Sequence, residues 1–150
     1  MFTKIKYKQG ELILEWRDGD DNESVVHAMT STEDPRPEFH TALQALTAHV
    51  LRVCQFPIDY ADEMKIIGVA LSENDHQGRG VVVTATKKLP GLKAPLVINT
   101  PHVTESEGEQ PGALRQESID LIEELIAEAV RFRKGERAQQ DMFADQQKAA

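Results

Sequence analysis

The chain contains 150 residues, of which 40% are hydrophobic, and its 17 basic and 25 acidic side chains give a formal net charge of −8. A chain of this length and composition forms one domain with its own core and is too short for two. The negative charge argues against broad electrostatic attraction to nucleic acid or anionic membranes, although it permits a local basic patch.

The sequence shows neither a signal peptide nor an apolar run of membrane-spanning length, so we expect a cytoplasmic protein with no membrane partner. The single cysteine, Cys54, excludes an internal disulfide and is typical of a reducing compartment. No basic residue lies three or four positions from Cys54 to stabilise a thiolate, which favours a buried apolar role over a reactive thiol.

Residues 3–16 predict a β-hairpin around a two-residue turn at Gln9 and Gly10. This turn places lysines opposite glutamates and apolar side chains opposite apolar ones, so a single register sorts both faces of the hairpin. The expected pairs are Lys4 with Glu15, Ile5 with Leu14, Tyr7 with Leu12, and Lys8 with Glu11. Ile13, opposite Lys6, is the one apolar residue on the polar side, and Trp16 extends the apolar side.

A turn at residues 18–22 leads to a third expected strand at residues 24–29. Asp18, Asp20 and Asn22 resemble the opening of a calcium-binding loop. Glu23 replaces the glycine that bends such a loop, and Met29 replaces the glutamate that closes it. The sequence therefore predicts a turn here and no calcium site.

The segment from Pro35 to Pro57 predicts the central helix of the fold. Its apolar residues recur at steps of four and three and give one continuous apolar face; they are Phe39, Leu43, Leu46, Val50 and Val53. Asp34 is expected to cap the first turn, where proline is tolerated, and Pro57 is expected to end the helix.

Beyond this helix, residues 57–63 predict a loop, and residues 64–72 and 81–88 predict a second hairpin with a long polar tip. A short strand is expected at residues 96–99, followed by a mobile surface loop at residues 102–112. From Ala113 the pattern turns helical, with Gly135 as the expected cap. The apolar stripe of this second helix comprises Leu114, Ile119, Ile122, Leu125, Ile126, Ala129 and Val130.

The predicted order is therefore strand, strand, strand, helix, strand, strand, strand, helix. An α+β fold, in which an antiparallel sheet carries both helices on one face, lets all the apolar stripes share one core. We expect this domain to span residues 1–135, with a disordered polar tail at residues 136–150.

The sequence offers little catalytic chemistry. No zinc-ligand spacing, nucleophile elbow, dinucleotide fingerprint or Walker motif is recognisable, so we expect no cofactor and no enzymatic activity. Asp59, Asp62 and Glu63 form an acidic cluster that is compatible with a metal-dependent enzyme, although three carboxylates in a short loop more often form only a solvated loop.

Basic residues offer a second possibility, a local nucleic-acid-binding patch. The residues of this candidate patch are Lys4, Lys6, Lys8, Lys87, Lys88 and Lys93. A further basic group lies at the end of the second helix, where it suits the negative end of the helix dipole; its members are Arg131, Arg133, Lys134 and Arg137.

The tail contains the pentapeptide QQDMF at residues 139–143. It resembles the motif by which bacterial replication and repair proteins bind the DNA sliding clamp. That resemblance implies that Gln139 is the amide anchor and that Met142 and Phe143 fill the pocket of the clamp. Gln140 and Met142 stand where the motif usually has leucine.

The whole chain also resembles a group of small, uncharacterised phage and prophage proteins found among bacteriophage replication and recombination genes. The resemblance lies in the lysine-rich opening strand and in the segments DPRPEFHTAL, APLVINTPH and GERAQQDMF. We therefore expect a non-enzymatic accessory protein tethered to the bacterial sliding clamp, and the sequence leaves its oligomeric state open.

Overall fold

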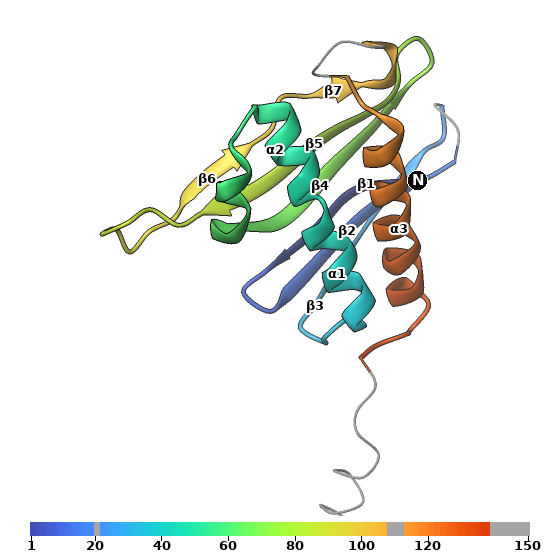
Figure 1. The fold of residues 1–150 in the computed structure, drawn as a ribbon. Helices are drawn as coiled ribbons and strands as arrows, with labels where there is room; N and C mark the ends of the chain where they lie inside the picture. The colour runs from blue at the N-terminus through green and yellow to red at the C-terminus, as the bar shows by residue number, and fades with distance from the viewer. Residues whose placement is uncertain (20–21, 108–112, 139–150) are drawn as a thin grey trace, which may run out of the picture.

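An antiparallel sheet is covered on one face by helices, and no described element covers its other face (Figure 1). The computed structural model describes residues 1–19, 22–107 and 113–138. The strands are β1 (Phe2–Lys8), β2 (Glu11–Asp18), β3 (Val25–Ser31), β4 (Met64–Asn74), β5 (Gly78–Lys87), β6 (Leu96–Asn99) and β7 (Val103–Thr104). They are ordered β3-β2-β1-β4-β5-β6, and β7 also pairs with β5. The predicted α+β class is confirmed, with one more strand than expected.

The helical layer consists of α1 (Pro37–Ala45), α2 (Thr47–Cys54) and α3 (Gln116–Arg133). Two 3-10 helices complete the described part, η1 (Ile58–Glu63) and η2 (Glu105–Glu107). Thus η1 replaces the loop expected before β4. The surface loop expected at residues 102–112 contains β7 and η2, while residues 108–112 lie outside the described residues.

The first hairpin has the predicted register, with Lys4 opposite Glu15 and Tyr7 opposite Leu12. Gln9 and Gly10 have φ values of 53° and 76°. Two successive residues with positive φ form the turn whose twist matches that of the flanking strands. The local turn and the long-range burial therefore favour the same pairing.

The central helix is divided at Leu46, where the prediction of one helix was wrong. The Leu46 amide bonds to the Leu43 carbonyl three residues back, and the Thr47 hydroxyl donates to the Gln44 carbonyl at 2.8 Å. These tighter bonds replace the regular ladder for one turn. Asp34 does not cap the helix, because its carboxylate lies 2.8 Å from Nε2 of His40.

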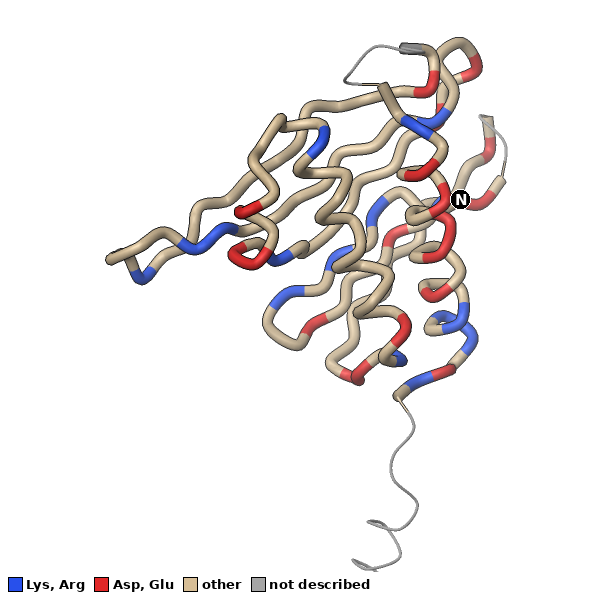
Figure 2. The backbone as a smooth tube through the Cα atoms, in the orientation of Figure 1, with Lys and Arg blue, Asp and Glu red and all other residues tan. Residues whose placement is uncertain are grey.

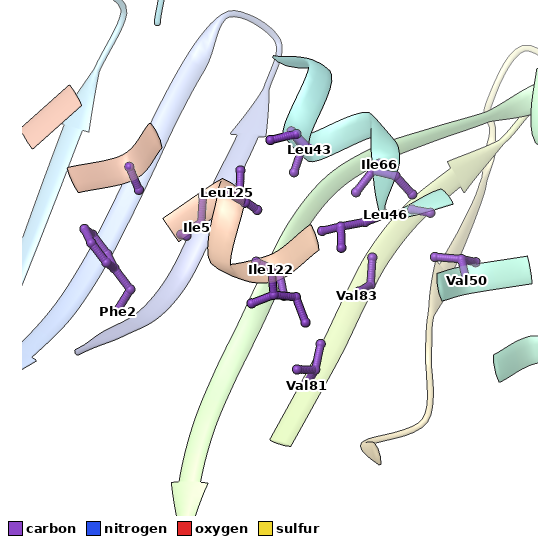
Figure 3. Close-up of a cluster of buried hydrophobic side chains, with 14 of the residues drawn as sticks. Phe2, Ile5, Leu43, Leu46, Val50, Ile66, Val81, Val83, Ile122 and Leu125 are labelled. Carbon is purple, nitrogen blue, oxygen red and sulfur yellow. The ribbon is translucent and has the colours of Figure 1, made fainter. Parts of the chain in front are cut away.

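The predicted apolar face survives this break and forms the centre of the core (Figure 3). Leu43, Leu46 and Val50 are each fully buried, as are Ile5 from β1 and Leu125 from α3. The stripe of α3 packs on the same core, although Ile126 and Val130 remain half-buried. Each Å² of apolar surface that folding removes from water stabilises the protein by roughly 25 cal/mol. The shared core therefore makes the main stabilising contribution to the fold.

Candidate functional site

The domain extends further along the chain than the sequence predicted, because residues 137 and 138 are bound to it. The Arg137 guanidinium lies 3.5 Å from the centre of the Phe132 ring, donates to the Phe132 carbonyl at 2.6 Å and pairs with Glu33. The Ala138 amide donates to the Asp34 carbonyl at 3.0 Å. Within the expected tail at 136–150, Arg137 and Ala138 are thus bound to the loop before α1, and Glu136 contacts Arg131 of α3. Gln139, Met142 and Phe143 lie outside the described residues.

The basic residues at the end of α3 do not form one patch. Arg131 reaches Glu136 at 3.8 Å, whereas Arg133 stacks 5.2 Å from the centres of the Phe2 and Trp16 rings. Arg137 is bound to Glu33 on another side of the helix. These contacts give the cations separate structural roles.

Lys4, Lys6 and Lys8 point away from the helices, because they alternate along β1 with Ile5 and Tyr7, which face the core. The lysines therefore form a row on the open face of the sheet. Within the described part of the chain, none of the three takes part in an ion pair. Lys8 lies four positions along the strand from Lys4, a distance of about 13 Å.

A trough of about 330 Å³ runs beside this lysine row. Gly68 and Ala70 of β4 form its floor, since they offer almost no side chain. Thr84, Val97 and Asn99, on β5 and β6, line its other wall. We call this feature the lysine trough; it places three cations beside polar side chains along a shallow channel.

The other lysines of the predicted patch lie elsewhere. Lys87 is on the helix-covered side, where its ammonium group lies 2.9 Å from Glu63 and 4.4 Å from the centre of the Tyr60 ring. Lys88 directly follows β5, and Lys93 lies in the connection from β5 to β6. Figure 2 shows the basic positions of this connection apart from those of β1. The structure therefore brings together three of the six lysines. The alternation of Lys87 with buried Val81, Val83 and Ala85 was the signal that could have removed it from the patch.

The acidic cluster occupies η1, where Glu63 is held by Lys87. Asp59 and Asp62 are exposed. Among the described residues, no group of three or more histidine, cysteine or carboxylate side chains is arranged to hold a metal ion. Glu63 therefore has a structural role, as the ion-pair partner of Lys87.

Ser72 and His102 form a pair that the sequence did not reveal, because thirty residues separate them. Their Oγ and Nε2 atoms are 3.0 Å apart above Gly80, where any Cβ would collide with both side chains. A serine beside a histidine is the start of a nucleophilic site. In the described part of the chain no carboxylate bonds to His102, and both side chains are exposed, so the group that would orient the base is missing.

A cavity of about 320 Å³ lies between α3 and the sheet. It is lined chiefly by apolar side chains, among them Phe2, Leu71, Val81, Ile122 and Ile126. Arg79 stands at its rim but is already bound to Glu105 at 2.6 Å and Glu123 at 2.8 Å. This network ties β5 to η2 and α3, so the arginine has a structural role at this cavity.

Buried and half-buried side chains on α2 have shifted pKa values, and burial is the main cause of each shift. Burial lowers the pKa of His49 to about 4, and the positive charge of Arg52 adds to the effect. Burial raises the pKa of the Cys54 thiol, which keeps it protonated at neutral pH. Cys54 is half-buried rather than buried, as its position beside the apolar face permits.

Comparison with known proteins yielded no match to a protein family, to a curated protein or to a solved structure. In residues 1–19, 22–107 and 113–138, no helix has both the length and the apolar character needed to cross a membrane.

Proposed function

We propose that this protein is a non-enzymatic accessory protein of phage DNA replication or recombination, tethered to the bacterial sliding clamp by residues 139–143. The observation that supports it best is the position of the pentapeptide. It begins directly after Ala138, the residue whose amide is bonded to Asp34. A binding peptide in this place is carried at a fixed point of the domain surface.

The chemistry of the pentapeptide suits this role. Met142 and Phe143 are the only large apolar residues after Phe132. Side chains of this kind supply the affinity of short peptides that dock into preformed pockets, and an amide such as that of Gln139 fixes their register. The Arg137 contacts fix the chain two residues before this segment, which lowers the entropy cost of binding.

Titration of the full chain into purified bacterial sliding clamp by calorimetry tests the proposal. We expect micromolar binding, which the double substitution Met142→Ala/Phe143→Ala weakens by at least about 100-fold, since each buried side chain contributes about 1.5–3 kcal/mol. The matched control Gln146→Ala/Gln147→Ala changes the same tail and should bind like the unaltered chain. Undiminished binding by the Met142/Phe143 variant, or none by the unaltered chain, refutes the tether.

A second candidate function, binding of single-stranded nucleic acid, is favoured by the lysine trough. Three unpaired ammonium groups in a row can neutralise neighbouring phosphates along one strand. The described residues of the trough include no aromatic side chain on which bases could stack, so this binding would read the phosphate backbone and not the sequence.

A further inference from the structure

The two edges of the sheet are protected very differently. The β6 edge is four residues long, is flanked by Pro95 and Pro101, and is continued along β5 by the short strand β7. Short strands and prolines are devices that prevent a sheet edge from pairing with another chain. The β3 edge has none of them, since its seven residues, VVHAMTS, contain no proline, lysine, arginine or carboxylate.

β3 is also regular and exposed. It pairs with β2 over all seven residues without a bulge, and in the part of the chain that the structure describes no strand pairs with its outer edge. Val25 and Val26 are 55% and 61% exposed, although both are large apolar residues. A regular edge strand without proline, lysine, arginine or carboxylate presents a row of backbone donors and acceptors suited to a further strand.

We propose that β3 pairs in antiparallel fashion with β3 of a second copy of this chain, about a two-fold axis at Ala28. In this register Ala28 faces the partner's Ala28, and Val26 faces the partner's Thr30. Small and β-branched residues thus oppose one another on the open face, and no like charges meet within the paired segment. The strand is complementary to itself, which is what a two-fold interface requires.

The contrast between the edges also explains why pairing would stop at two copies. Among the described residues, each chain has one unprotected sheet edge, so the dimer pairs the two β3 edges with each other and leaves the proline-flanked β6 edges outside. A sheet with two unprotected edges would instead continue to grow. The two-fold axis is perpendicular to the sheet, and both helical layers therefore stay on the same side. This inference does not depend on the clamp-binding segment.

A disulfide experiment tests the register. In a Cys54→Ser background, Ala28→Cys places two thiols about 5 Å apart across the axis, close enough to bridge with small adjustment. Thr30→Cys is the matched control, because its two copies lie about 13 Å apart along the strands. Ala28 and Thr30 are both exposed, so neither change disturbs the core. We expect covalent dimers under mild oxidation from Ala28→Cys only; cross-linking of Thr30→Cys alone, or of neither variant, overturns the proposed register.

Sedimentation equilibrium of the unmodified chain tests the dimer itself. We expect a reversible dimer, which Val26→Lys converts to a monomer by placing a charge on the pairing face. Leu92→Lys is the control, since Leu92 is 65% exposed on the connection between β5 and β6. A monomer at every concentration, or a dimer that Val26→Lys does not weaken, overturns the proposal.

Discussion

At the scale of single residues, His49 is the side chain whose chemistry the fold changes most. It is 1% exposed, and its Nδ1 lies 2.9 Å from the hydroxyl of Ser118 on α3. Its Nε2 has no partner among the described residues, so a proton added there would bring a buried charge. Burial accordingly lowers the pKa of His49 to about 4.

This shift predicts acid destabilisation. The unfolded chain takes up the proton near pH 6.5 and the folded chain near pH 4, so stability is full above about pH 6.5 and falls as the pH drops to about 4. At about 1.4 kcal/mol per pKa unit, the loss is about 3 kcal/mol. Urea unfolding between pH 4 and 7.5 should show this loss in the free energy of unfolding of the unaltered chain. The control His76→Gln, at an exposed turn, should show the same loss. The free energy of unfolding of His49→Leu should lack that part of the pH dependence. If it changed with pH in parallel with that of the unaltered chain, His49 would not be the group responsible.

At the scale of elements, Gln44 links the helical layer to an unpaired part of β4. Its amide nitrogen donates to the Ile66 carbonyl and its oxygen accepts from the Ile66 amide, both at 3.0 Å. β1 pairs with β4 only from Gly68 to Ala70, so Ile66 has no strand partner on this side. The side chain of Gln44 therefore takes the place of a neighbouring strand.

Replacing Gln44 by alanine should leave both backbone groups of Ile66 without a protein partner. We expect a loss of about 1–2 kcal/mol in the free energy of unfolding, because the site is only partly buried and water can compensate in part. Gln116→Ala is the control, since Gln116 bonds only to Asp120 on the surface of α3. Chemical denaturation measures both, and equal stabilities of the two variants would show that the Gln44 bridge contributes nothing.

The elements that the sequence predicted well are those decided by neighbouring residues. The turn at Gln9 and Gly10 fixes the first hairpin, and the periodicity of Leu43, Leu46 and Val50 fixes the core face of the helices. The missed features depend on residues distant in sequence. Val103 becomes part of a strand only because β5 has an open stretch beside it, and the Ser118 partner of His49 is 69 residues away. Three of the six lysines predicted to form a patch line the lysine trough. The prediction included Lys87 because its charge does not indicate which face of the sheet it occupies.

At the scale of the whole molecule, a net charge of −8 opposes the attraction of the lysine trough for a polyanion. Binding of single-stranded DNA should therefore appear only at low salt. With three phosphates contacted, the plot of log K against log salt concentration should have a slope of about −2. Fluorescence anisotropy measures this slope.

Variants separate the trough from general electrostatics. Lys4→Gln/Lys6→Gln/Lys8→Gln should abolish the binding, whereas Lys134→Gln removes a positive charge at the far end of α3 and should change it little. Equal weakening by the triple and the single variant would assign the effect to overall charge and remove the trough as a site.

The anchor at Arg137 and Ala138 has a mechanical consequence. Any pull on the C-terminal segment enters the domain at these two residues, and their contacts divide the load between α3, through Phe132, and the loop before α1, through Glu33 and Asp34. Two segments more than 90 residues apart along the chain thus resist the same force. The last turn of α3 is shielded from being peeled away first, so a partner could drag this domain by its tail without unravelling it from the end.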